Sequence, residues 1–291
     1  MGYDLLSTTI GRGARLALGA AAVVAVILPD ALAGQWVEAP GKGWISAEVY
    51  HQDTTDRYDL EAVKGPIPFG GHAKSTAFFV TGAVGLIPNW DLWARGSVNS
   101  LSFFDAGGDR SEDGLGDANV WLRVAPLKYL GVDFPFAIRG GVKLPVGDSP
   151  VDAEIIPLSE GQTDWEIMAE IGHSFWPRSV YVNGWVGYRY RELSEEAAID
   201  PGAEIFFLAQ VGGAVGNFQY KLVAEGWDSD APVQEGLSIE SSQRQYVQLT
   251  PSLWYETPVG GFEVGWRVPL VGRNLPAGGA LVLGYFTRFG I

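Results

Sequence analysis

The chain has 291 residues, contains no cysteine and carries a formal net charge of −14 at pH 7. The lack of cysteine excludes disulfide bonds and thiol chemistry, and the acidic balance argues against nucleic acid as a partner. Thirty-nine glycines occur beside eleven tryptophans and eleven tyrosines. Because glycine is unfavourable within helices while aromatic residues favour strands, this mixture indicates an all-β protein.

The start of the chain has the pattern of a secretory signal peptide. Two arginines precede an apolar run at 16–28, and an A-x-A cleavage sequence follows at 31–33. A membrane anchor is the alternative, but this run is too short to cross about 30 Å of hydrocarbon as a helix. We therefore expect residues 1–33 to be removed, which leaves 34–291 as the mature domain.

Period-2 alternation predicts twelve strands and little helix in the rest of the chain. Many of these strands are longer than those of soluble sheets, and they are long enough to cross a bilayer at a tilt. The predicted strands are 43–54, 73–87, 91–104, 115–125, 133–144, 162–175, 179–192, 203–215, 217–228, 243–257, 261–271 and 279–291.

The connections between these strands alternate in length. Short turns follow the even-numbered strands, at 88–90, 127–131, 177–178, 216–217 and 258–260. Mostly longer, polar loops follow the odd-numbered strands, at 55–72, 105–114, 145–161, 193–202, 229–242 and 272–278. Outer-membrane barrels have short periplasmic turns, long external loops and an even number of strands. The pattern predicts a transmembrane antiparallel up-and-down β-barrel of about twelve strands with both termini in the periplasm.

The two faces of each predicted strand differ in polarity. Within 261–271, for example, Val264 and Trp266 share one face, while Glu263 and Arg267 share the other. A soluble barrel would turn its apolar face inward, whereas a membrane barrel turns that face toward lipid and its charges into the lumen. The glycine content and the aromatic pattern favour the membrane arrangement.

Aromatic residues gather near the predicted turns and loops, as in the interfacial girdles of membrane proteins. A plain enrichment of aromatic residues at strand ends is the alternative. The predicted periplasmic girdle contains Trp90, Tyr129, Trp176, Phe218, Tyr255, Phe262 and Phe289. The predicted outer girdle contains Tyr50, Tyr190, Phe206, Trp227 and Tyr246.

The two-residue turn at 177–178 fixes the register of its flanking strands. It sets Glu166 opposite Arg189 and Asp164 opposite Arg191, all on the face away from lipid. We therefore predict cross-strand ion pairs in the lumen, which either line a substrate path or satisfy one another and close a narrow barrel. The candidate residues for the lumen and the substrate path are Lys143, Gln162, Asp164, Glu166, Glu170, Arg189, Arg191, Arg139, Arg123, Arg95 and Arg267.

The outer mouth has a different character. Leu101 and Phe103 have lumen parity, which predicts either an apolar entry site or a β-bulge that shifts the register. The external loops carry many acids, which either hold divalent cations that bridge lipopolysaccharide phosphates or form a solvated rim. No calcium-loop motif is present, so we expect no cofactor and no specific metal site.

No catalytic motif accompanies the three histidines, His51, His72 and His173. His173 precedes a serine, but both lie beside a predicted periplasmic turn, and His51 has no evident serine partner. We therefore expect no enzymatic activity. Two functions stay open: a channel or transporter for small molecules, and a structural or adhesive barrel with an occluded lumen.

The final strand, GALVLGYFTRFGI at 279–291, has an apolar face with Leu281, Leu283 and Tyr285. An open apolar edge would aggregate, so we expect this strand to pair with the first strand and close the barrel. A C-terminal strand with alternating apolar residues also resembles the signal that barrel-assembly machinery recognises. Such signals mostly end on Phe or Trp, whereas here the last aromatic residue is Phe289.

Three motifs resemble one family of outer-membrane barrels. They are G-x-K-L-P-x-G at 141–147, G-Q-x-D at 161–164 and V-G-Y-R-x-R at 186–191. They are similar to a core found in transporters linked to the meta-cleavage pathway of phenol degradation, a family grouped near the long-chain fatty-acid transporters. The resemblance covers 139–192 and implies passage of small hydrophobic or aromatic compounds across the outer membrane. The fatty-acid transporters carry an N-terminal plug, whereas we expect 34–42 to be too short to fill a lumen.

Overall fold

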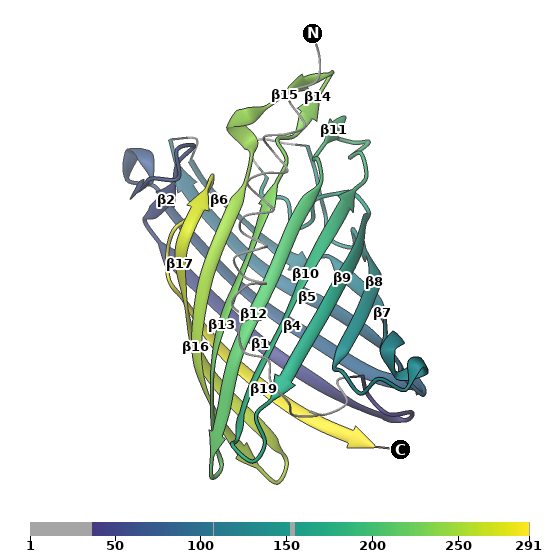
Figure 1. Ribbon diagram of the computed structural model, residues 1–291. Coiled ribbons are helices and arrows are strands. Elements are labelled where there is room, and N and C mark those ends of the chain that lie inside the picture. The colour runs from purple at the N-terminus through teal and green to yellow at the C-terminus, as the bar shows by residue number, and fades with distance from the viewer. Residues whose placement is uncertain (1–36, 107, 152–154, 291) are drawn as a thin grey trace.

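The computed structural model describes residues 37–106, 108–151 and 155–290, and these residues form a closed antiparallel β-barrel (Figure 1). Thirteen strands make one sheet, in which β6 and β7 follow each other along the same neighbour, β5, so the barrel has twelve strand positions as predicted. The barrel strands are β1 (Lys42–Thr54), β4 (His72–Ile87), β5 (Trp90–Asp105), β6 (Gly108–Leu115), β7 (Ala118–Val124), β8 (Phe136–Leu144), β9 (Asp164–Ser174), β10 (Val180–Arg191), β12 (Glu204–Val215), β13 (Phe218–Ser229), β16 (Gln245–Thr257), β17 (Gly260–Arg273) and β19 (Ala280–Gly290).

The first and last strands close the barrel. β1 pairs with β19 from Lys42 opposite Gly290 to Gln52 opposite Ala280, and β1 pairs with β4 along its other edge. The backbone hydrogen bonds of the final strand are therefore used within the barrel. The expectation that the chain ends without a free edge is confirmed.

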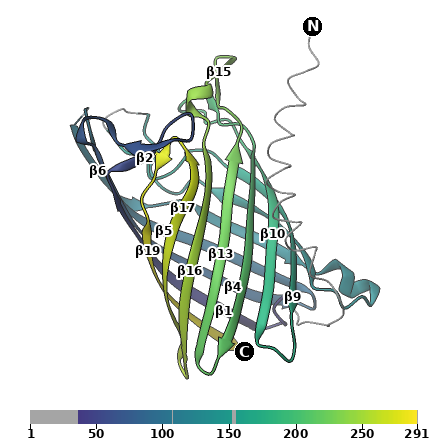
Figure 2. The same cartoon turned by 60° about the vertical axis from the view of Figure 1, so that its left-hand side comes forward.

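The two ends of the barrel differ, as the alternation of connections predicts. We call the end with the connections at 88–89, 175–179, 216–217 and 258–259 the turn end, and the opposite end the loop end (Figure 2). The turn end also carries the short helix η2 (Pro126–Leu130). The loop end carries β2 (Asp56–Tyr58), β3 (Lys64–Pro66), η1 (Pro68–Gly70), β11 (Ile199–Asp200), β14 (Val233–Gln234), β15 (Leu237–Ser238), η3 (Glu240–Ser242) and β18 (Leu275–Pro276).

The predicted loop at 105–114 is wrong. Most of it belongs to a hairpin of β5 and β6, in which Asp105 lies opposite Gly108. Asp109 and Asp113 lie on the exposed outer face of β6, where a membrane strand would carry apolar residues. This part of the barrel wall is therefore polar on its outer face, and the apolar alternation that marks a membrane strand is absent from it.

The strand position shared by β6 and β7 is interrupted at residues 116–117. Gly116 still donates its N–H to the carbonyl of Ser97 on β5, at 3.0 Å. On the other side, β8 pairs with β7 but not with β6. The loop between β8 and β9 reaches this edge, because an added Cβ on Gly147 would lie only 2.2 Å from the carbonyl oxygen of Leu115.

The connection before β8 is longer than predicted. The sequence predicts a turn at 127–131 and a strand from residue 133, but η2 occupies the turn and β8 begins at Phe136. Gly131 has a left-handed backbone (φ 70°) and ends the helix, and Lys128 forms an ion pair with Asp133. These interactions hold the residues before β8 outside the sheet.

The barrel turns its apolar face outward. Val264 and Trp266 are 50% and 51% exposed, while Glu263 is 8% exposed and points inward. Arg123 and Arg139 are also buried on the inner face. This inverted arrangement is that of a barrel surrounded by hydrocarbon.

The turn-end girdle agrees with its prediction, whereas the outer girdle does not. Tyr129, Trp176 and Phe218 are exposed at the turn end. At the other end only Tyr190 of the five predicted residues is exposed, next to exposed Trp165 and Tyr188. The lumen holds the other four, which are Tyr50, Phe206, Trp227 and Tyr246. Each lies two positions along its strand from an inward-facing polar residue. Because residues two apart on a strand share a face, each of the four rings points into the lumen.

The predicted signal segment, residues 1–33, lies outside the described residues. Within the described part of the chain, the helices are all short, and none is long and apolar enough to cross a membrane.

Because the outward face meets lipid, we predict that a charge on this face destabilises the barrel more strongly the deeper it lies in the membrane. Leu222 lies on the outer face in the middle of β13 and is 41% exposed. We expect Leu222→Arg to lower the free energy of unfolding by about 2–4 kcal/mol in phospholipid vesicles, because the charge enters hydrocarbon. Urea titration of the refolded barrel measures this change. Gln245→Arg, on the outer face of β16 at the loop end, is the control and should cost at most about 1 kcal/mol; equal costs would contradict the assigned lipid face.

Candidate functional site

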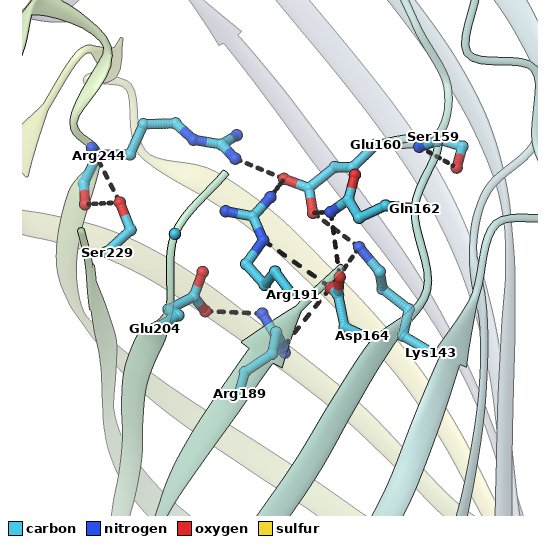
Figure 3. Close-up of polar contacts among 12 residues, drawn as sticks. Lys143, Ser159, Glu160, Gln162, Asp164, Arg189, Arg191, Glu204, Ser229 and Arg244 are labelled. Atoms are coloured by element: carbon cyan, nitrogen blue, oxygen red, sulfur yellow. Dashed lines mark hydrogen bonds and ion pairs between the residues drawn. The ribbon is translucent and has the colours of Figure 1, made fainter. Parts of the chain in front are cut away.

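The three sequence motifs meet at one place on the inner wall. Lys143 on β8 lies 2.6 Å from the carboxylate of Asp164 on β9, and Gln162 donates its amide to Asp164 at 3.1 Å (Figure 3). Arg191 on β10 lies 4.0 Å from the same carboxylate. Asp164 is fully buried. Residues from all three motifs therefore form one charge cluster around Asp164.

The predicted register of β9 and β10 is confirmed. Glu166 lies opposite Arg189, and Asp164 lies opposite Arg191. Arg189 approaches Glu166 at 2.7 Å and also contacts Glu204 of β12 at 2.6 Å. The ion pairs thus continue across three neighbouring strands, and sequence reasoning missed Glu204.

Glu160 joins this cluster from the loop between β8 and β9, and sequence reasoning missed it. Its carboxylate lies 2.7 Å from Lys143, 2.8 Å from Arg191 and 2.5 Å from Arg244, which directly precedes β16 (Figure 3). Burial alone would raise the pKa of Glu160, but the charges of these three residues outweigh it and hold the pKa well below its usual range. Glu160 thus ties its loop to the inner wall. Only its position directly before G-Q-x-D hinted at this role.

A second charge cluster lies on the same wall nearer the turn end. Arg123 pairs with the fully buried Asp91 at 2.6 Å and with Glu170 at 3.2 Å. Arg139 lies 2.6 Å from Glu170. Asp91 was missed, although it shares the lumen parity of Arg95.

Aromatic rings surround this second cluster. The guanidinium of Arg139 lies 4.8 Å from the ring centre of Trp93, 5.6 Å from that of Trp121 and 5.8 Å from that of Trp185. Trp121 also donates its indole N–H to Glu166 at 2.5 Å, which links the two clusters. The inner wall therefore combines paired charges with stacked indoles.

Two motif glycines make room for these rings. A Cβ on Gly141 would lie 2.2 Å from the Trp121 ring, and one on Gly187 would lie 2.6 Å from the Phe206 ring. Both glycines face the lumen from strands next to those rings. Their place in G-x-K-L-P-x-G and V-G-Y-R-x-R thus has a steric reason.

The remaining candidates also face the lumen. Arg267 on β17 pairs with Glu48 on β1 at 2.9 Å. Arg95 on β5 lies over the ring of Phe79, 4.2 Å from its centre. All eleven candidates thus belong to the inner wall or to the loop that adjoins it.

Two cavities occupy the turn-end half of the lumen. The turn-end cavity has a volume of about 700 Å³ and is lined by Ser174 and Glu256, among others. The middle cavity has a volume of about 450 Å³ and contains the Arg139 cluster. The residues that line both are Trp44, Asn183, Gln210 and Arg288. The two cavities are therefore neighbours.

Two further cavities continue this series toward the loop end. Arg95 and Trp185 line both the middle cavity and a loop-end cavity of about 490 Å³. Gln52 and Pro276 line both the loop-end cavity and a mouth cavity of about 440 Å³. Four cavities therefore follow one another along the barrel.

The mouth cavity contains the predicted apolar site. Leu101 and Phe103 line it together with Ile155 and Ile156 of the loop between β8 and β9. The pairing of β5 around Leu101 and Phe103 is regular on both sides, and its irregularity with β4 lies at residues 85–87. The β-bulge alternative is therefore wrong.

The described residues before β1 reach the turn end of the lumen. Val37 is buried against Ala125 and the lumen-facing Ala137. The backbone N–H of Glu38 donates to Asp91 at 2.9 Å, and the Glu38 carboxylate lies 3.3 Å from Arg288. These residues leave a turn-end cavity of about 700 Å³ open, which agrees with the expectation that the segment is too short to fill the lumen.

The described residues contain no group of three or more His, Asp or Glu side chains placed to hold a metal ion. Some acidic residues of the loop end contact local partners: Asp53 pairs with His72, and Asp59 accepts backbone N–H groups of its own loop. His51 contacts Thr76 at 2.8 Å, and His173 packs against Phe175.

Comparison of the sequence with protein families finds a match over residues 69–285, about three quarters of the chain. The matching model is described as "Putative MetA-pathway of phenol degradation". The chain belongs to this family. Comparison with curated proteins finds no match.

The barrel is similar to several solved structures. An outer membrane channel from Pseudomonas putida F1 is 12% identical, with a TM-score of 0.69 over 90% of this chain and 100% of that one. The translocator domain of autotransporter NalP from Neisseria meningitidis is 10% identical, with a TM-score of 0.48 over 97% and 98%. The NanC porin is 11% identical, with a TM-score of 0.48 over 84% and 99%. This family member is thus a twelve-stranded barrel with the fold of the channel from Pseudomonas putida F1.

The buried pair of Glu166 and Arg189 predicts a specific loss of stability. The Glu166 side chain is 1% exposed and accepts bonds from Arg189 and Trp121. We expect Glu166→Gln to lower the free energy of unfolding by about 1–3 kcal/mol, because it weakens two buried charge-assisted bonds while Arg189 keeps Glu204. Urea titration in vesicles measures this change. Glu195→Gln, on an exposed loop, is the control and should stay within about 0.5 kcal/mol; equal values for both variants would contradict the pairing.

The contacts of Glu160 predict how the loop-end cavity responds to charge and pH. Glu160→Gln removes the attraction to three cations, so we expect a larger and noisier single-channel conductance at neutral pH. A carboxylate with a depressed pKa stabilises the fold above its unfolded pKa and loses this effect as pH falls through the folded pKa. Wild-type conductance should therefore stay constant down to the ordinary glutamate pKa of about 4.3 and become noisy only as pH falls below it.

Planar-bilayer recording measures the conductance of both proteins. The control is Glu196→Gln, on an exposed loop, which should behave as the wild type. A quiet, wild-type conductance in Glu160→Gln would show that Glu160 does not hold the loop.

Proposed function

We propose that this protein is a channel for small hydrophobic or aromatic molecules across the bacterial outer membrane. In this proposal the turn end faces the periplasm, so that both termini lie there, and the loop end faces the medium. The series of four cavities along the lumen is the observation that carries the proposal. A barrel with a purely structural role has no need of adjoining cavities from its mouth to its other end.

The lining of these cavities supports the substrate class. Apolar side chains line the mouth cavity, and aromatic rings line the next two, including Phe206, Trp227 and Trp185. Apolar pockets with a few convergent polar groups are typical binding sites for small organic molecules. The family description, which refers to phenol degradation, points to the same chemistry.

The ion pairs have a supporting role in this proposal. Asp164, Glu166 and Arg191 are fully or nearly fully enclosed by their partners, and such paired charge mainly satisfies itself. Together with Lys143, Gln162 and Arg189, they form one side wall of the passage.

Two surfaces of the barrel suggest partners. The outward apolar belt contacts membrane lipid, and we propose that the acidic loop end meets lipopolysaccharide through solvated carboxylates. We also propose that β19, with exposed Leu283 and Phe289 on its outer face, is the segment recognised by the barrel-assembly machinery.

We further propose that the protein is not an enzyme. The hydroxyl partner of His51 is Thr76, and the acidic partner of His72 is Asp53. These contacts belong to two separate pairs on the outer wall. Such pairs do not form the hydroxyl–imidazole–carboxylate series that activates a nucleophile.

A blocked passage tests the channel. Asn183 lines both the turn-end and the middle cavity, so Asn183→Trp should fill the passage between them. We expect this variant to lose most ion conductance and most uptake of labelled phenol by intact Gram-negative cells. Val182→Trp places the same ring on the outer face of the same strand and should keep both activities. Normal uptake in cells that express a folded Asn183→Trp variant would reject the proposed route.

A further inference from the structure

Arg95 differs from the other basic candidates of the inner wall. The other six, Arg123, Arg139, Lys143, Arg189, Arg191 and Arg267, each lie within 4.0 Å of a carboxylate. Within the described ranges, Arg95 has no carboxylate within 4.0 Å and no side-chain hydrogen bond, and its close contact is the ring of Phe79. The carboxylates of Glu48, Glu225 and Glu166 attract it only from farther away. Stacking uses one face of a guanidinium and leaves the N–H donors along its edge available.

The position of Arg95 gives these donors a role. Arg95 and Trp185 line both the middle and the loop-end cavity, so a solute that moves between these cavities passes both side chains. An unpaired guanidinium inside a barrel is unfavourable unless water or an anion meets it. Arg95 therefore offers an anion-binding point on the route itself.

Aromatic rings surround the route on the loop-end side of Arg95. Trp185 contacts Phe206 edge to face, with ring centres 5.4 Å apart, and Trp227 contacts Tyr246 at 4.9 Å. All four rings line the loop-end cavity, whose volume of about 490 Å³ accommodates a substituted benzene ring. Rings of this kind pack against an aromatic solute while a guanidinium binds its carboxylate in a two-pronged geometry.

We propose that Arg95 binds the carboxylate of small aromatic acids in transit and makes the channel favour them over uncharged aromatic molecules of the same size. This inference rests on the proposed channel function and names one substrate class for it. Arg95 acts as a specificity residue, whereas the paired arginines maintain the wall.

A ligand with an ammonium group is the competing class, because Glu225 also lines the loop-end cavity. Gln248 donates its amide to Glu225 at 2.6 Å, so this carboxylate already has a partner. Glu225 also lines only one of the two cavities, whereas Arg95 lines both. The geometry therefore favours the acid over the amine.

Blockade of the ion current tests the proposal, because a solute that enters the lumen interrupts the current. We expect benzoate to block the wild-type channel at lower concentration than benzyl alcohol. Arg95→Gln should raise the blocking concentration of benzoate about tenfold, which corresponds to about 1.4 kcal/mol. The same variant should change that of benzyl alcohol less than about twofold, and Arg95→Lys, which keeps the charge but loses the fork, should give an intermediate value for benzoate.

Each result has a separate meaning. Absence of any ion current through the wild-type protein would reject the channel function itself, whereas failure of both solutes to change that current would reject aromatic substrates and with them the role of Arg95. Blockade by both with equal strength, or an unchanged benzoate block in a folded Arg95→Gln variant, would reject only the role of Arg95. Stronger block by benzylamine than by benzoate would favour Glu225 instead and would also overturn the proposal. Heat-modifiable mobility of the barrel on gels confirms that each variant is folded.

Discussion

Satisfaction of backbone polar groups in hydrocarbon is the constraint on which this structure depends. Every N–H and C=O group at membrane depth needs a partner within the protein, so a sheet in lipid must close on itself. Pairing of β1 with β19 achieves this closure and removes the free edge of the last strand. Once the sheet is closed, the alternation of side chains decides which residues meet lipid and which meet the enclosed lumen. The charged residues lie on the face toward the lumen.

Enclosed charge in turn requires partners, and the inner wall shows how they are found. Glu166 and Arg189 pair across neighbouring strands, while Glu160 descends from a loop to meet three cations. Such pairs offset the desolvation of each charge but leave little attraction for a solute. Selectivity for a solute must therefore come from groups that take no part in these ion pairs. Arg95 and the rings beside it are such groups.

Much of this architecture could be predicted from the sequence, because two simple rules apply along the whole chain. Alternation places Arg123, Arg139 and Arg267 inside, and a tight turn at 177–178 fixes the pairing of Glu166 with Arg189. These rules fail where a strand lacks apolar alternation and where a residue lies in a loop. The outer face of β6 is polar and lacks the apolar alternation, and Glu160 acts from a loop, to which parity does not apply. The prediction that Phe206 and Trp227 belong to the outer girdle is wrong, because parity and not nearness to a strand end decides which face a residue takes.

The inward position of Phe206 and Trp227 matters for function. Aromatic residues in a girdle would stabilise the barrel at the interface, whereas the same residues inside line the loop-end cavity. Gly141 and Gly187 support this second role, since a Cβ at either position would collide with an inner-wall ring. A side chain at either position would push the neighbouring ring away from the wall and toward the barrel axis. Glycine beside large rings instead seats the rings against the wall, and this arrangement leaves space along the barrel axis for a solute.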